Sequence, residues 1–122
     1  MPRNESHDPA YLWDMLDAAK AILVFVAERT FDDFQTDRML RNAVERNLEI
    51  IGEAANRISD NFQKSHQEIP WKNIIGQRNI LIHEYGEVRS ERIWVVATER
   101  IPELVAILNP LLSQMSTKND NP

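Results

Sequence analysis

The chain has 122 residues, 43% of them hydrophobic, with only three glycines and no cysteine, which indicates a compact helical protein without disulfides or cysteine-based metal sites. The formal net charge of −5 opposes non-specific binding to nucleic acid, so an enzyme acting on nucleic acid would have to concentrate its positive charge locally. No apolar run approaches the roughly 20 residues that cross a bilayer, and the polar N-terminal segment has no signal-peptide core, so we expect a cytoplasmic protein without membrane contact.

The first predicted element is a long helix from about Pro9 to Arg29. Asp8 is the expected N-cap, and Pro9 suits the first turn because no helical bond is lost there. The apolar positions that follow the helical period are Leu12, Leu16, Ala19, Leu23 and Val26. Because Tyr11, Trp13 and Met15 lie off this stripe, we expect a second face of the helix to be covered as well.

A second long helix is predicted over about Arg38 to Asp60, after a break over residues 30–37 in which Phe31 and Phe34 hold a short turn against the body of the protein. Asp37 is its expected N-cap, and Gly52 would allow another helix to approach closely. The predicted buried stripe is Leu40, Val44, Leu48, Ile51, Ala55 and Ile58. Residues 61–69 are read as a polar connector that can be helical at its start and that leaves His66 in solvent.

The third predicted helix runs from Pro70 to Gly86, since proline suits a first helical turn and glycine a helix end. A last helix starts near Ser90, and Pro102 must kink or break it. Residues 116–122 are expected to be disordered. Together these elements predict an all-α fold, an antiparallel bundle of four or five helices, as one domain over residues 1–122 with an ordered core from about 8 to 115.

Four polar residues of the third helix form a candidate site: Arg78, Asn79, His83 and Tyr85, with the pattern R-x4-H-x-Y. Asn79 and His83 share a face of the helix, whereas the spacing of Arg78 and His83 separates their directions by roughly 140°. Either the arginine side chain curls around the helix, or a second copy of the helix supplies the missing partner across a dimer axis.

These residue types could cleave a phosphodiester without a metal or cofactor. The imidazole of His83 could take a proton from a ribose 2′-hydroxyl and return one to the leaving oxygen, and the guanidinium of Arg78 could hold the phosphate. Asn79 could orient either group. The competing interpretation is structural: Arg78 and His83 would form a buried network, Asn79 would be an ordinary helix residue, and Tyr85 would be an aromatic residue with its hydroxyl in water.

Two further sets of residues have alternative interpretations. Arg46 and Glu53, on the second long helix, belong either to a solvated face of paired charges or to a layer that supports the Arg78/His83 cleft. Trp71 and Trp94 are read as core or interface anchors and not as platforms for base stacking. No grouping of metal ligands is evident in the sequence.

Two blocks of the sequence resemble the HepT-like family of HEPN-domain proteins. They are Pro70 to Gly86 (PWKNIIGQRNILIHEYG) and Arg46 to Ala55 (RNLEIIGEAA), and the resemblance extends from about Tyr11 to Leu112. It implies an endoribonuclease, an RNA hydrolase, that acts as a homodimer in which the Arg78 and His83 residues of both subunits line one cleft.

The resemblance also implies a partner. Proteins of this kind are toxins of type VII HepT/MntA toxin–antitoxin systems, and a minimal nucleotidyltransferase antitoxin (MntA-like) would transfer AMP to the motif tyrosine, which here is Tyr85. The expected substrate is RNA, either tRNA or mRNA. The rival hypothesis is a helical dimer without catalysis that serves as the binding subunit of a nucleotidyltransferase, and the acidic charge balance favours it slightly.

Overall fold

The computed structural model describes the backbone of residues 5–83 and 90–119 and the side chains of residues 5–81 and 90–115. Within these ranges all regular secondary structure is helical, which confirms the predicted all-α class. The elements are η1 (Glu5–His7), α1 (Asp8–Val26), α2 (Phe31–Thr36), α3 (Arg38–Arg57), α4 (Asp60–Ser65), α5 (Trp71–His83), α6 (Ser90–Val95), the π-helical η3 (Val96–Arg100) and α7 (Ile101–Asn119).

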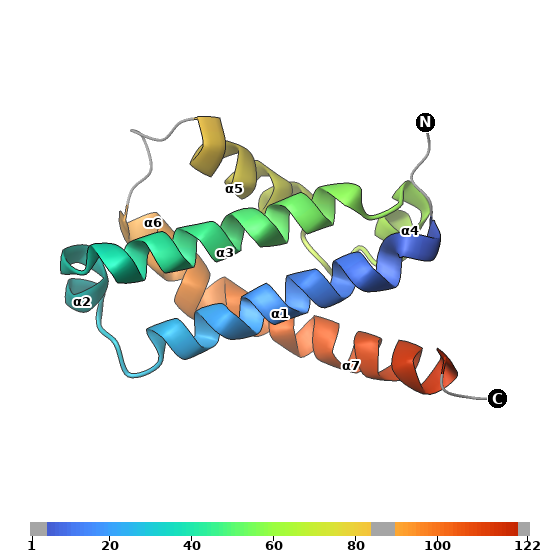
Figure 1. The fold of residues 1–122 in the computed structure, drawn as a ribbon. Coiled ribbons are helices and arrows are strands. Elements are labelled where there is room, and N and C mark those ends of the chain that lie inside the picture. Colours follow the sequence, from blue (N-terminus) through green and yellow to red (C-terminus); the bar gives the residue numbers. More distant parts are fainter. Residues whose placement is uncertain (1–4, 84–89, 120–122) are drawn as a thin grey trace.

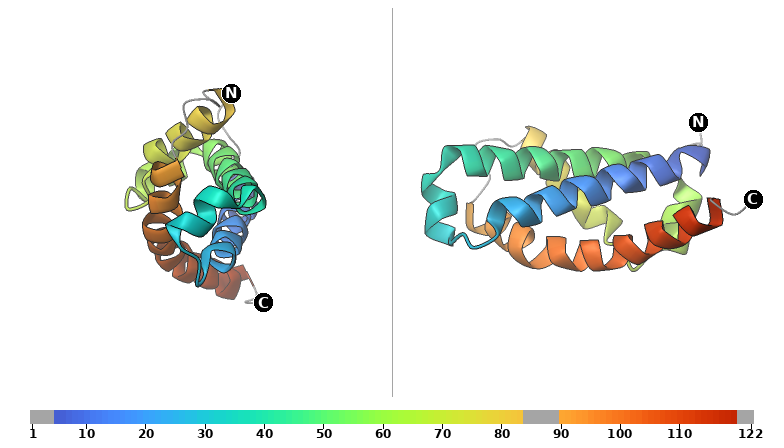
Figure 2. Two further views of the ribbon diagram at one scale, coloured as in Figure 1. Left: turned by 90° about the vertical axis from the view of Figure 1, so that its left-hand side faces the viewer. Right: turned by 60° about the horizontal axis from the view of Figure 1, so that its bottom comes forward.

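The long helices form an antiparallel bundle. Figure 1 shows α3 between α1 and α5, with α7 running along the other side of α1. Seen end-on in Figure 2, these helices surround a common interior, and α2 covers one end of it. Among the helices in the described ranges, none is long and apolar enough to cross a membrane.

The core confirms the predicted stripe of α3 and corrects that of α1. All six expected core positions between Leu40 and Ile58 are buried. On α1, Met15 was expected off the stripe but has no exposed surface, and Ile22 is equally buried, because α1 is covered by α3 on one side and α7 on the other. Trp13 remains 57% exposed, so the second covered face does not extend to it within this chain.

The start of α1 differs from the prediction. Asp8 is not the N-cap; it is the first residue of the helix and is buried. Its carboxylate accepts hydrogen bonds from the backbone N–H of Ser59 (2.9 Å) and from the Ser59 hydroxyl (2.6 Å). The same Ser59 oxygen caps α4 by accepting from the N–H of Phe62 at 3.2 Å. A contact between residues so distant in sequence leaves no local pattern, which is why it was missed.

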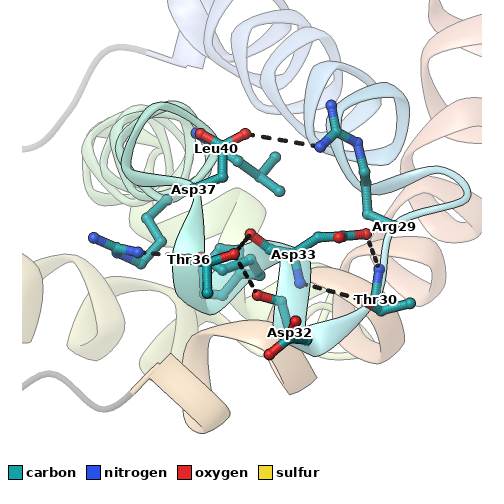
Figure 3. A network of polar contacts seen from close by, with 9 residues as sticks. Arg29, Thr30, Asp32, Asp33, Thr36, Asp37 and Leu40 are labelled. Atoms are coloured by element: carbon teal, nitrogen blue, oxygen red, sulfur yellow. Dashed lines mark hydrogen bonds and ion pairs between the residues drawn. The ribbon is translucent and has the colours of Figure 1, made fainter.

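The expected break before α3 is a short helix, α2, and α1 ends at Val26 instead of Arg29. The Thr30 hydroxyl accepts from the Asp33 N–H (3.1 Å) while the Asp33 carboxylate accepts from the Thr30 N–H (2.9 Å), a reciprocal capping box visible in Figure 3. Asp37 caps α3 as predicted, accepting from the Leu40 N–H at 3.2 Å. The buried ring of Phe34 fixes α2 to the bundle.

Pro102 interrupts the last helix as predicted. The chain widens into the π-helical turn η3 directly before it, and the Ile101 N–H donates to the carbonyl of Val96, five residues back. This widening accommodates the proline ring, which would otherwise clash with the carbonyl of the preceding turn. The helix α7 continues to Asn119, and the predicted disorder of residues 116–122 stays a prediction.

The connector before α5 begins with a short helix, which agrees with the expectation, but His66 does not lie where it was predicted. Residues 60–65 form α4, and His66 is half-buried, with its ring stacked on Phe62 at a centroid distance of 3.9 Å. The carbonyl of His66 accepts a hydrogen bond from the indole N–H of Trp71 at 3.0 Å. The prediction that His66 lies in solvent is therefore wrong.

Candidate functional site

The helix that carries the motif, α5, is anchored at both of its ends. The Pro70 carbonyl accepts the first helical bond from the Ile74 N–H at 3.0 Å, so Pro70 directly precedes the helix. Trp71 is 8% exposed and packs edge-on against Phe62, as expected of a core anchor. Near the other end Leu81 is 2% exposed. The predicted stop at Gly86 lies outside the described residues.

Arg78 sits where α5 comes closest to α3. A Cβ atom added to Gly52 would lie 2.1 Å from Cβ and 2.8 Å from Cγ of Arg78, and 3.2 Å from the carbonyl oxygen of Ile74. The absence of a side chain at Gly52 therefore allows the two helices to touch, as the sequence predicted. The aliphatic stem of Arg78 is held directly against the α3 backbone.

The guanidinium of Arg78 is largely unpaired within the described part of the chain. Its Nη1 donates to Oδ1 of Asn79 at 2.9 Å, and its Nε is buried without a hydrogen-bond partner. Among the described residues no carboxylate lies within ion-pair distance of it; by contrast, Arg29 and Arg100 each have one and Arg46 has two. Arg78 thus keeps donors available for an anion, with Asn79 fixing the orientation of one of them.

The predicted supporting residues form a charge cluster on α3. Arg46 lies 3.2 Å from Glu49 and 3.8 Å from Glu53, and its own side chain is 60% exposed. Glu53 directly follows Gly52 and so adjoins the crossing with Arg78. Among the described residues Glu53 pairs with Arg46 and not with Arg78. That Arg46 and Glu53 support the Arg78/His83 cleft stays a prediction.

His83 and Tyr85 cannot be placed in the same way. His83 is the last residue of α5, one helical turn beyond Asn79, but its side chain lies outside the described residues. Tyr85 also lies outside them. The structure therefore brings together Arg78, Asn79 and Gly52, and it places the backbone of His83 on the same helix.

Burial affects one carboxyl group near this cluster. Desolvation raises the pKa of Glu45 above the value of 4.5 of an unperturbed group; Arg41 lowers it and Glu49 raises it further. Among the described residues no three His, Cys, Asp or Glu side chains gather as a metal site would require.

Gln77 is a residue of this region that sequence reasoning missed. Its side-chain Nε2 is buried without a hydrogen-bond partner among the described residues, and Gln77 borders an apolar cavity of about 80 Å³ between α3, α5 and α7. The helical period places Gln77 on the same side of α5 as Ile74 and Leu81, so the sequence spacing could have indicated that its side chain is buried.

The chain is thus a small helical domain in which Arg78 lies where α5 crosses α3, one to two turns before the end of α5. A sequence profile of the family described as Ribonuclease HepT-like matches residues 15–111, and the chain belongs to this family. No solved structure gives a significant match to the chain.

Several proteins are similar to this chain over most of its length. A protein of Thermococcus cleftensis named "Probable ribonuclease HepT" is 42% identical over 77% of this chain and 86% of its own length. The Methanocaldococcus jannaschii proteins named "Putative RNase MJ1380" and "Putative RNase MJ0127" are 37% and 31% identical, over 78% and 99% of this chain and 87% and 98% of their own lengths.

Proposed function

We propose that the protein is a metal-independent endoribonuclease toxin that acts in the cytoplasm. The observation that carries this proposal is the guanidinium of Arg78, whose stem rests on Gly52 and whose donors have no carboxylate partner among the described residues. Its position on the same helix as His83, and the ribonuclease names of the relatives, support the same chemistry.

In the proposed reaction the neutral imidazole of His83 removes the proton from a ribose 2′-hydroxyl. The 2′-oxygen then attacks the neighbouring phosphorus, the bond to the 5′-oxygen breaks, and an imidazolium protonates that leaving oxygen. Arg78 binds the phosphate and stabilises the additional negative charge of the transition state, while Asn79 holds the guanidinium in place. The products are a 2′,3′-cyclic phosphate and a 5′-hydroxyl, so DNA is not a substrate.

We further propose that a homodimer forms the cleft. Arg78 and His83 diverge by roughly 140° around α5, so a histidine from one subunit would meet an arginine from its partner more readily than its own. Mixing Arg78→Ala and His83→Ala subunits tests this idea. If the sites are shared, mixed dimers retain one intact site of two and the mixture recovers about a quarter of wild-type activity. If each subunit is self-sufficient, the mixture stays inactive.

We propose that Tyr85 is the point of control. A nucleotidyltransferase antitoxin would transfer AMP to its hydroxyl, which would place negative charge and bulk in the path of the RNA. The intact mass of protein co-expressed with such a partner tests this step. An increment of one AMP per chain that disappears in Tyr85→Phe supports it, and an unmodified chain from an inactivated complex contradicts it.

The rival function, a non-catalytic binding subunit of a nucleotidyltransferase, is favoured by one observation, the net charge of −5. Cleavage of total RNA by the purified protein separates the two. His83→Ala is the decisive variant: we expect it to abolish cleavage and relieve growth arrest while its helical circular dichroism stays unchanged. Full-rate cleavage by this variant would end the catalytic assignment.

A further inference from the structure

A groove lined by two lysines lies beside the first turns of α5. It has a volume of about 660 Å³ and is open to solvent, and α4, the connector after it and the start of α5 form its walls. Lys64 and Lys72 line it, together with the amides of Gln67 and Asn73, and Asp60 contributes the opposing charge.

The two lysines differ from Arg29, Arg46 and Arg100 in having no carboxylate partner among the described residues. Lys64 and Lys72 are also both exposed. In a protein with five more acidic than basic residues, unpaired cations that share one groove are the features that can attract a polyanion.

An unobstructed face of α5 connects this groove to the candidate site. Lys72, Gly76 and Asn79 fall on one side of the helix, and the helical period places the backbone of His83 on the same side. At Gly76 an added Cβ would meet nothing within 4 Å, and Asn79 is exposed, so no part of the described chain covers this face between them. Lys72 and Asn79 are separated by about 10 Å along the helix axis, at about 1.5 Å per residue.

We propose that this groove and face form an extended binding track for the sugar–phosphate backbone of a single RNA strand, with Lys72 contacting a phosphate about three nucleotides from the one beside Asn79 and Lys64 contacting the strand in the same groove. The estimate uses a rise of about 3.4 Å per stacked nucleotide. Trp71 lines the groove, but only 8% of its surface is exposed and its N–H already donates to the His66 carbonyl, so it offers little area for stacking a base. Recognition in the groove is therefore independent of sequence.

This inference rests on the proposed ribonuclease function and deepens it, so the test measures binding apart from cleavage. The probe is fluorescent oligouridylate of 3, 6 and 12 nucleotides, titrated at several salt concentrations into His83→Ala protein with and without Lys64→Ala and Lys72→Ala. Lys20→Ala is the matched control, because Lys20 is an exposed lysine on α1 outside the groove.

We expect loss of the two lysines to weaken binding of the 12-mer by about 2- to 30-fold, the effect of two exposed ion pairs. The slope of log K against log salt should fall by about 1.4, since each single-strand phosphate contact contributes about 0.7. The loss should grow with oligonucleotide length, and Lys20→Ala should change neither quantity.

If the variant that carries both Lys64→Ala and Lys72→Ala kept the same affinity and the same salt slope, the proposed binding track would be contradicted. Equal competition by polyglutamate would also contradict it, because this result would indicate a general anion surface or a protein-docking surface. Failure of the ribonuclease proposal has a different signature, because protein with intact His83 would then leave RNA uncut even where the lysine-dependent binding is observed.

Discussion

The contact between Gly52 and Arg78 allows a direct test of how α3 positions the candidate site. In Gly52→Ala, the new Cβ would lie 2.1 Å from the Arg78 Cβ and 3.2 Å from the Ile74 carbonyl oxygen. The Arg78 Cβ is bonded to the backbone, so no change of rotamer relieves the overlap. The two helices must instead separate by more than 1 Å to approach the roughly 3.5–4.0 Å of an ordinary carbon–carbon contact.

The expected stability change combines two opposing effects. Inserting a methyl group into a packed contact costs about 1–3 kcal/mol, and the upper end applies because backbone must move. Replacing glycine by alanine within a helix returns about 0.8–1 kcal/mol. The net loss is about 2 kcal/mol, which corresponds to a fall in Tm of about 8 °C for a chain of this size.

Activity should fall further than stability alone explains. A displacement of about 1 Å at a catalytic group can cost about 100-fold in rate, so we expect RNA cleavage by folded Gly52→Ala to decrease by that order. The assays are thermal unfolding followed by circular dichroism, and cleavage rates measured well below Tm.

Gly76→Ala is the matched control for the stability measurement. It is the same substitution within a helix, but an added Cβ meets nothing within 4 Å, so the variant should be about 0.8–1 kcal/mol more stable than wild type. A Gly52→Ala protein that equals wild type in both stability and cleavage would refute the proposed role of the helix crossing.

Three further changes test individual contacts. Gln77→Met should stabilise the fold by about 1 kcal/mol in denaturant unfolding, because it removes a buried amide nitrogen that has no partner; a loss of stability would show that the amide is bound. Asp37→Ala should destabilise the fold by about 0.5–2 kcal/mol through loss of the cap on the Leu40 N–H, and an unchanged Tm would contradict this. Because folding raises the pKa of Glu45, its ionised carboxylate destabilises the folded state at pH values above that raised pKa. This destabilisation disappears below the pKa of the unfolded chain, about 4.5, where the carboxyl group is protonated in both states. Glu45→Gln should therefore raise Tm at pH 7 and have no such effect near pH 4; equal effects at both pH values would contradict the assignment.

The parts of the fold that were predictable from sequence are those encoded by local pattern. The period of apolar residues identified the buried stripe of α3, Asp37 identified its start, and Pro102 identified the interruption before α7. Gly52 was recognised as a point of close approach, although nothing local indicated that Arg78 would be its neighbour.

The errors arose where distant contacts decide the local structure. Asp8 has the sequence context of an N-cap, but the serine at position 59 binds its carboxylate. Met15 looked peripheral by period and is buried because two helices cover α1. His66 stands among polar residues, yet Phe62 one turn earlier offers a ring to stack on.

The residues of the candidate site were predicted from the sequence motif, whereas the surroundings of Arg78 are known only from the structure. The pairing of Arg78 with Asn79 follows from adjacency on α5, whereas the shortage of carboxylates around Arg78 depends on where α3 places Arg46, Glu49 and Glu53. The roles of His83 and Tyr85 remain predictions from the motif.

The central claim, RNA cleavage by attack of a 2′-hydroxyl with His83 as the acid–base group, is tested most directly by the chemistry of the cut ends. Purified protein should cut a ribo-oligonucleotide in the presence of a chelator to leave 2′,3′-cyclic phosphate and 5′-hydroxyl ends. A single 2′-deoxy substitution at the cleaved nucleotide should block that cut. Cleavage that persists at the deoxy position, or products with 3′-hydroxyl ends, would contradict the account.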